Sequence, residues 1–336
     1  MQKTGPDMNR KSALVRSARL VQKTPLSLMR VLEAPLLHVL KKQEHNCQLI
    51  ILLALPRSGS TLTYQALVHA LQPAYLTNVW NMFYALPLTA GALSSWVCRG
   101  YQSDFQSEQG FIGGPCGPAE GLRFWSYWLG NGLDEHRQPN LCQRRLEKRI
   151  RYVRNVLGLV STPEKPFLTG FVGHALVVDQ LFSLFPNALF IRLHRDPLSN
   201  AYSLLRLRKN EGGQWFSVYP RECAEYIGCS LHQQVAAQVY FLNKRLDEKI
   251  IKERTLHISY EALCRDPNKT MNNVITSFNR YDMSLSFMRR LPEKFSYKSI
   301  NVHHNDDSRQ LAQALNDFNL SFGKLSNQSK EAFTSE

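Results

Sequence analysis

The sequence predicts an α/β fold with a central, mostly parallel β-sheet that is flanked by helices. Short, wholly apolar segments bounded by polar residues, such as QLIILLAL at 48–55, are typical of strands buried on both faces. These segments alternate with stretches in which apolar residues recur every three or four positions, as they do in amphipathic helices. Strand–helix alternation of this kind is the pattern of βαβ units.

The expected elements can be placed along the chain by their residue patterns. In order, they are a strand at 48–55, a helix at 62–71, an amphipathic helix at 141–157, a strand at 167–171, a helix at 176–185, a strand at 188–193, a helix from 197, a helix at 231–251 and a strand at 255–259. The composition further divides the chain into a basic amphipathic N-terminal arm at 1–46, a main domain at 47–300, and a polar C-terminal helix and tail at 301–336.

Length and composition exclude two broad classes of protein. The chain has 336 residues, of which 43% are hydrophobic and 20% charged, so it can bury a core and is not mainly disordered. Its longest purely apolar run, Leu49–Leu55, is far shorter than the roughly 20 residues of a membrane-spanning helix. The formal net charge of +14 points to an anionic partner, which nucleic acid, anionic lipid, an acidic glycan or a phosphate-bearing cofactor would each satisfy.

The arm at 1–46 carries nine Lys and Arg residues against three acidic ones, with apolar residues between them. It is therefore a candidate for lying on an anionic membrane surface. The alternative is one or two surface helices that pack on the domain and leave their charges solvated.

Seven cysteines are scattered along the chain without a CxxC pair. This pattern argues against a disulfide framework or a zinc ribbon, and it predicts reduced thiols in a cytoplasmic protein, at most peripheral to the inner face of a membrane. Because no secretory signal is seen, the N-glycosylation sequons are interpreted as chance occurrences. The His- and Asp-rich segment at 303–307 lacks metal-ligand spacing, so no metal is expected.

The loop Pro56–Thr61 joins the first expected strand to its helix, where backbone N–H groups and the helix dipole favour an anion. Gly59 permits close approach, Ser60 and Thr61 supply hydroxyl groups, and Arg57 supplies a planar cation. The loop lacks the Lys of a G-x-x-x-x-G-K-[ST] motif, which argues against a small-molecule kinase. The alternative is an ordinary helix N-cap made by a serine of the loop.

A second anion-binding element is predicted at His194–Pro197, where another strand ends and a helix begins. Arg195 lies at the strand end, and Ser203 follows it by eight residues, so the two can hold a phosphate group together. Alone, the segment is also a common way to end a turn and begin a helix, with Asp196 as the N-cap and Pro197 at the first helical position.

Together, the two elements resemble the sulfotransferase superfamily that uses 3′-phosphoadenosine 5′-phosphosulfate (PAPS), in particular its bacterial polysaccharide-type family. LALPRSGST resembles the family's 5′-phosphosulfate loop, and FIRLHRDPLSNAYSLLRLR resembles its 3′-phosphate motif. The resemblance extends over roughly residues 47–285, with supporting segments at Gly117–Gly121, Phe124-Trp125, Trp215–Val218 and His257–Pro267.

This resemblance implies a three-layer fold related to that of the P-loop NTPases, and PAPS as co-substrate without a metal. It implies two groups of cofactor-binding residues, one around the 5′-phosphosulfate and one at the 3′-phosphate. The first group is Arg57, Ser58, Gly59, Ser60 and Thr61, and the second is Arg195 and Ser203.

The implied activity is in-line transfer of a sulfuryl group (EC 2.8.2 type) to a hydroxyl group of a glycan or glycolipid acceptor. Catalysis of this kind needs a cation at the leaving phosphate, for which Arg57 is the candidate, and a general base for the acceptor. Glu120 is the first candidate for the base because the resembling segment places a Glu beside the acceptor, and His174 is the second. The alternatives are a carboxylate at a helix N-terminus and a core histidine.

One departure from the family pattern concerns a Lys that many relatives carry before the FP(N/D)A segment. The corresponding residue here is Gly170, so Arg57, Arg123 or His174 would have to compensate. This departure leaves open a catalytically impaired PAP- or PAPS-binding relative. A nucleic-acid-binding protein is a further alternative that the net charge suggests, although no nucleic-acid-binding motif supports it.

Four aromatic residues allow two interpretations. They could line the acceptor cleft, because aromatic faces stack on sugar rings, or they could belong to the hydrophobic core, where aromatic residues are found more often. They are Trp125, Trp128, Trp215 and Phe216. Tyr260 and Glu261 are expected to be structural, where a strand turns into a helix.

Overall fold

The computed structural model describes residues 33, 47–98, 100–108, 110–130, 132–137 and 142–318. The predicted membrane-binding arm at 1–46 therefore lies outside the described residues, apart from Glu33, and so does the end of the predicted C-terminal tail.

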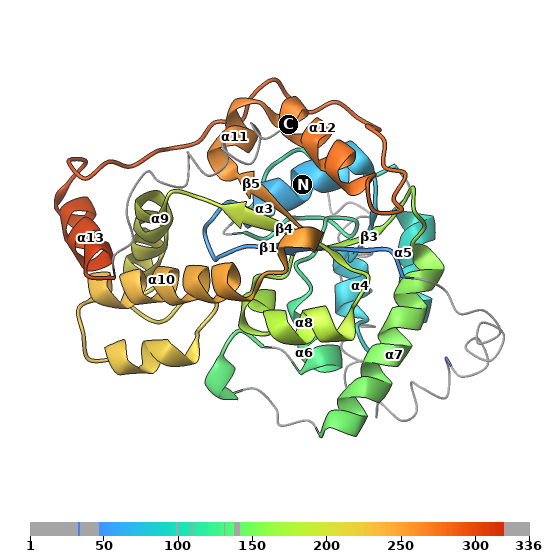
Figure 1. Ribbon diagram of the computed structural model, residues 1–336, viewed down its shortest axis with the longest axis horizontal. Coiled ribbons are helices and arrows are strands. Elements are labelled where there is room, and N and C mark those ends of the chain that lie inside the picture. Colours follow the sequence, from blue (N-terminus) through green and yellow to red (C-terminus); the bar gives the residue numbers. More distant parts are fainter. Residues whose placement is uncertain are drawn as a thin grey trace, which may run out of the picture.

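A five-stranded, wholly parallel β-sheet forms the centre of the domain (Figure 1). In spatial order its strands are β2 (Ala74–Tyr75), β3 (Phe167–Thr169), β1 (Leu49–Leu53), β4 (Leu189–His194) and β5 (Thr255–Ser259). The predicted α/β class is confirmed, and four of these strands coincide with predicted segments. Strand β2, with two residues, is too short for a sequence pattern to predict.

Helices cover both faces of the sheet. They are α3 (Ser60–Leu71), α4 (Asn78–Met82), α5 (Pro87–Val97), α6 (Leu122–Leu129), α7 (Gln143–Val160), α8 (Val178–Leu184), α9 (Pro197–Asn210), α10 (Leu231–Lys249), α11 (Tyr260–Arg265), α12 (Pro267–Phe278) and α13 (Asp306–Asn316), with short 3₁₀ turns at Glu135–Arg137, Val172–Leu176, Arg221–Tyr226 and Lys252–Arg254. Within the described part of the chain, no helix is both long and apolar enough to cross a membrane.

Strand β1 divides the core into two layers because its successive side chains point to opposite faces of the sheet. Leu49, Ile51 and Leu53 pack in one cluster with residues of α6, α7, α8 and α10. Ile50 and Leu52 belong to the other cluster, with α3, α11 and α12 (Figure 1). The complete burial of β1 explains its unbroken apolar sequence.

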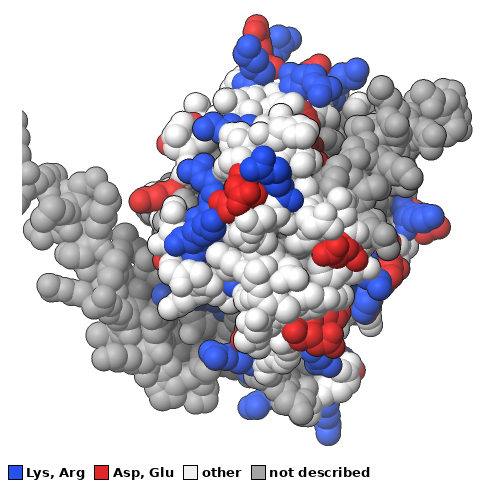
Figure 2. Space-filling model, turned by 90° about the vertical axis from the view of Figure 1, so that its left-hand side faces the viewer, with Lys and Arg blue, Asp and Glu red and all other residues white. Residues whose placement is uncertain are grey.

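Helix α13 begins at Asp306, within the segment predicted to be polar, yet it packs against α9 and α10 through buried Leu311 and Leu315. An ion pair of 2.6 Å between Lys209 of α9 and Asp307 also joins it to the domain. Figure 2 shows the face of the molecule on this side, where basic and acidic side chains lie close to one another. On this face, the excess positive charge of the chain does not form a continuous basic surface.

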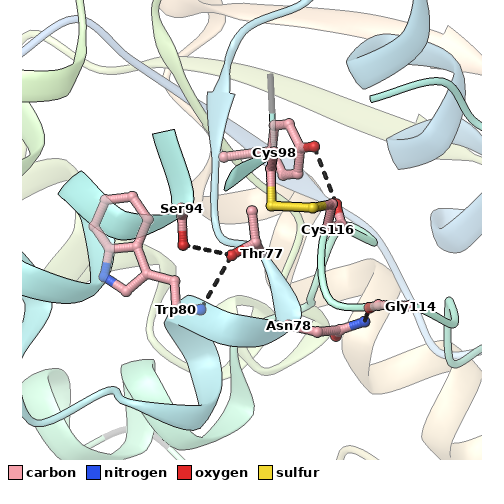
Figure 3. Close-up of a disulfide and its surroundings, with 8 residues drawn as sticks. Thr77, Asn78, Trp80, Ser94, Cys98, Gly114 and Cys116 are labelled. Atoms are coloured by element: carbon pink, nitrogen blue, oxygen red, sulfur yellow. Dashed lines mark hydrogen bonds between the residues drawn. A yellow bond between two sulfur atoms is a disulfide. The ribbon is translucent and has the colours of Figure 1, made fainter. Parts of the chain in front are cut away.

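Cys98, at the end of α5, and Cys116 form a disulfide (Figure 3). The prediction of reduced thiols is therefore wrong for these two residues, while the other five cysteines are free. The pair is separated by 18 positions and carries no local signal, because it forms only when the end of α5 lies beside the segment before α6. The argument for a cytoplasmic location that rested on reduced thiols is removed with it.

Candidate active site

The candidate site lies at the carboxyl ends of three adjacent parallel strands. Because β1, β4 and β5 are neighbours, the segments that follow them meet at one edge of the sheet. These segments carry Arg57, Arg195 and Tyr260 respectively. In an open α/β sheet, this edge is where ligands bind.

The loop after β1 is shaped by its own hydrogen bonds. Ser58 is buried, and both its backbone N–H and its hydroxyl group donate to the carbonyl oxygen of Leu55, at 3.2 and 2.7 Å. Ser58 therefore shapes the loop, whereas Gly59, Ser60 and Thr61 line the cavity. Helix α3 begins without a side-chain cap at Gly59, so its first N–H groups are available to an anion rather than to a serine.

Arg57 connects the two predicted anion-binding elements. Its backbone has a left-handed φ of 62°, and its Nε donates to the hydroxyl oxygen of Ser203 at 3.4 Å. In return, Nη1 of Arg195 donates to the carbonyl oxygen of Arg57 at 2.6 Å. Asn200 of α9 adds a bond of 2.8 Å to the carbonyl oxygen of Pro56. Two segments more than 130 residues apart thus form one cation-rich unit.

A cavity of about 420 Å³ opens beside this unit. Arg57, Arg195 and Glu120 all line it, and among its described lining residues Glu120 carries the one acidic side chain. A second cavity of about 250 Å³ shares Arg57 and Arg195 and extends to Ser203, Arg206 and Lys298. The two cavities therefore meet at the arginines, and together they offer an elongated site for an anionic ligand.

Glu120 is half-buried, directly before α6, on a segment that packs against the residues after β2. Burial raises the pKa of its carboxyl group to about 7, although the positive charge of Arg57 opposes this rise. Burial likewise lowers the pKa of Arg57, followed by repulsion from Arg195. A carboxyl group that titrates near neutral pH is suited to accept a proton from a substrate.

His174 lies apart from this cavity. It is fully buried between the rings of Trp125 and Phe171, at centroid distances of 4.9 and 5.3 Å, and neither ring nitrogen has a hydrogen-bond partner among the described residues. Burial lowers its pKa to about 3, so it is neutral at physiological pH. The structure thus brings Glu120, but not His174, together with the two arginines.

The position of the family Lys is tightly packed against Tyr64. Gly170 is buried, and a β-carbon there would lie 3.1 Å from the ring of Tyr64. Arg123 is exposed and does not line the cavity. Of the three residues considered as substitutes for the Lys, Arg57 is the one that reaches the site.

Several residues of the cavity have no motif that could have identified them. The ring of Tyr260, expected to be structural, lies beneath the Arg195 guanidinium at 4.9 Å and also lines the cavity. Asn78, Phe111 and Ile112 come from segments that carry no prediction. Of the four aromatic residues left open, Trp125 and Trp128 are core residues, Trp215 packs on Arg208, and Phe216 lines the cavity.

Comparison of this chain with known proteins indicates the family to which it belongs. A sequence model of the sulfotransferase family matches residues 49–280, more than two thirds of the chain. A search of curated proteins finds no significant match. Among solved structures, sulfotransferase STF9 from Mycobacterium avium has a TM-score of 0.48 at 17% identity, covering 75% of this chain and 68% of that one.

Two further structures are similar at this level. Sulfotransferase STF1 from Mycobacterium tuberculosis H37Rv has a TM-score of 0.45 at 15% identity, covering 98% of this chain and 86% of that one. The sulfotransferase domain of the Synechococcus PCC 7002 olefin synthase has a TM-score of 0.40 at 16% identity, covering 84% and 98%. On the match of the family model, the chain belongs to the sulfotransferase family.

Proposed function

We propose that this protein transfers a sulfuryl group from PAPS to a hydroxyl group of a glycan or glycolipid acceptor. Membership of the sulfotransferase family supports sulfuryl transfer in general. The observation that carries the finer proposal is the place of Arg57, which lines both cavities and contacts Ser203 and Arg195.

The donor set fits a nucleotide with phosphate groups at both ends. Arg57, with Gly59, Ser60 and Thr61 at the start of α3, would hold the 5′-phosphosulfate, because helix N–H groups, hydroxyl groups and a guanidinium all donate to anionic oxygens. Arg195 and Ser203, in the adjoining cavity, would hold the 3′-phosphate. Bound PAPS supplies the sulfuryl group and a phosphate leaving group.

Two side chains would act during transfer. Arg57 would stabilise the negative charge that grows on the leaving phosphate oxygen, which is the electrostatic contribution expected of a cation held in a preorganised site. Glu120 would accept the proton of the acceptor hydroxyl group, and its pKa of about 7 keeps a substantial fraction ionised at neutral pH. Because Gly170 supplies no cation and is packed against Tyr64, Arg57 would also take the part of the missing Lys.

The acceptor would enter on the side of Glu120. Phe111 and Phe216 line the same cavity as Glu120 and offer apolar faces on which sugar rings stack. A further cavity of about 520 Å³ shares Phe111, Ile112 and Ser107 with it, which leaves room for more than one sugar unit. These features favour an extended acceptor.

The test has two steps. Calorimetry first measures the affinity for PAP, which should bind the wild-type protein and Glu120→Gln equally well. ³⁵S-labelled PAPS is then incubated with neutral oligosaccharides and glycolipids, and transfer should be lost in Glu120→Gln but retained in Glu147→Gln, a control in α7. Failure of the wild-type protein to bind PAP would refute the proposal, whereas PAP binding without transfer by the wild-type protein to any acceptor would favour an impaired relative.

A further inference from the structure

The segment that carries Glu120 has little secondary structure of its own. In residues 107–108 and 110–121, the backbone bonds within the segment are those of an isolated bridge between Glu108 and Phe111 and one turn bond of 3.3 Å from the N–H of Gly117 to the carbonyl oxygen of Gly114. Phe111, Ile112 and Glu120 nevertheless line the catalytic cavity. The segment must therefore be held in place by contacts with the rest of the domain.

Asn78, at the start of α4, holds one side of this segment (Figure 3). Its side-chain amide donates to the carbonyl oxygens of Ile112 and Gly114, each at 2.7 Å. Its backbone N–H donates to Gly117 at 3.0 Å, and the N–H of Ala119 donates to Leu76 at 2.7 Å. These bonds fix the position of the segment relative to the residues that follow β2 and to the start of α4.

The disulfide holds the segment at Cys116, and its other cysteine, Cys98, lies at the end of a helix that is itself packed firmly in the domain. Cys98 ends α5, whose Ser94 hydroxyl lies 2.8 Å from the hydroxyl of Thr77 (Figure 3). Gly91 of the same helix lies so close to the ring of Trp80 that a β-carbon would be 2.8 Å away. Helix α5 is thus locked to α4, and through the disulfide it locks Cys116.

We propose that the Cys98–Cys116 disulfide is a positioning element for the reaction, which keeps Glu120 in the cavity that Arg57 also lines by fixing the segment before α6 to α5. Glu120 follows Cys116 by four residues, so the backbone between them spans at most about 14 Å, and a displacement of Cys116 can be passed along it to Glu120. The inference rests on the proposed role of Glu120. It adds that this role depends on a covalent bond outside the cavity, since neither sulfur-bearing residue lines it.

The pKa of the Glu120 carboxyl group can be used to detect a change in its position. Its pKa is raised to about 7 because it is buried, so a looser segment that admits water would lower the pKa toward the ordinary value of 4.5. A disulfide that merely stabilised the whole fold would leave this pKa unchanged in the folded protein.

The experiment begins by counting thiols. Iodoacetamide should modify five cysteines of the denatured protein without reductant and all seven after reduction. Cys98→Ser/Cys116→Ser is then compared with Cys142→Ser/Cys229→Ser, a matched control in which two exposed free cysteines are replaced. Hydrogen exchange is followed at 110–119, and the ¹³C signal of the Glu120 carboxyl, assigned by its loss in Glu120→Gln, is titrated.

In Cys98→Ser/Cys116→Ser, exchange at 110–119 should become about tenfold faster. The pKa of Glu120 should fall from about 7 toward 4.5. Exchange at 49–62 and the affinity for PAP should match the control. Unchanged exchange with an unchanged pKa would overturn the proposal, as would seven modified cysteines without reductant.

If the double variant does not fold, a phosphine reductant added to the folded wild-type protein opens the same bond, and both measurements are repeated. Neither measurement needs PAPS or an acceptor. A failure of sulfuryl transfer therefore counts against the proposed function, while an unaltered Glu120 titration counts against the positioning role.

Discussion

The ring of Tyr260 lies directly against Gly59, so closely that a β-carbon on Gly59 would be 2.2 Å from ring carbons of the tyrosine. Tyr260 is the first residue of α11, after β5, and Gly59 lies in the loop after β1. The tyrosine is itself held beneath Arg195, at 4.9 Å from its guanidinium. The loop after β1, the start of α11 and Arg195 are therefore packed together, which fixes the start of α3.

Gly59→Ala should be severely destabilising. The substitution combines a left-handed φ of 92° with an overlap that only a shift of Tyr260 can relieve, and these effects should cost about 3 kcal/mol. Gly212→Ala is the matched control, because Gly212 has a φ of 70° with open space around it and should cost about 1 kcal/mol. Urea unfolding measures both variants, and equal losses would contradict the packing argument.

Arg195→Lys tests whether geometry or charge matters at the second element. A lysine keeps the charge, but it lacks the planar group that bonds to the Arg57 carbonyl oxygen at 2.6 Å while lying over Tyr260. The dissociation constant for PAP should therefore rise by about tenfold or more, as measured by calorimetry. Arg265→Lys, at an exposed position of α11, serves as the control. A change within about twofold would show that charge alone suffices.

The rate of transfer should follow the ionisation of Glu120. The base acts in its deprotonated form, so kcat/KM for the acceptor found in the screen should rise with pH and level off above about 7. Below that pH, the rate should fall about tenfold per pH unit. A pH profile measured between about 4 and 9 checks this expectation, and a midpoint near the ordinary carboxyl value of 4.5 would contradict it.

The same pKa predicts that the stability of the protein falls with rising pH, whereas the rate of transfer rises. Since the folded pKa of Glu120 is raised to about 7 from 4.5, the folded state binds this proton more tightly than the unfolded state does. The wild-type protein should therefore lose stability as the pH rises between these values. Glu120→Gln removes this loss, so its Tm should exceed that of the wild-type protein at pH 8 by more than at pH 5. A constant difference would contradict the burial of the carboxyl.

The sequence predicted those parts of the site that are contiguous in the chain. The loop Pro56–Thr61 follows β1, which is fully buried and wholly apolar, and the segment from Arg195 to Ser203 follows β4, which is buried up to its last residue, His194. The structure adds that β1 and β4 are neighbours, which brings the two segments into contact. Such segments leave a local signal in the sequence, because their chemistry and their spacing occur together.

The remaining parts depend on distant segments and leave no local signal. Tyr260 becomes a site residue only because β5 lies beside β4. The pairing of Cys98 with Cys116 depends on where α5 ends, and scattered cysteines give no indication of it. For His174, the residue type alone suggested a catalytic role. Its environment is instead decided by packing between two aromatic rings, which the sequence does not indicate.

His174→Leu separates the two residues considered for the general base. In the part of the chain that the structure describes, the buried imidazole has no hydrogen-bond partner, so an apolar replacement should leave stability unchanged or raise it by about 1 kcal/mol. Phe171→Leu, in the same aromatic cluster, should instead lower stability because it removes packed atoms. Labelled PAPS with the acceptor from the screen should show wild-type transfer and an unaltered pH profile for His174→Leu. Loss of transfer without a change in Tm would reassign the base from Glu120 to His174.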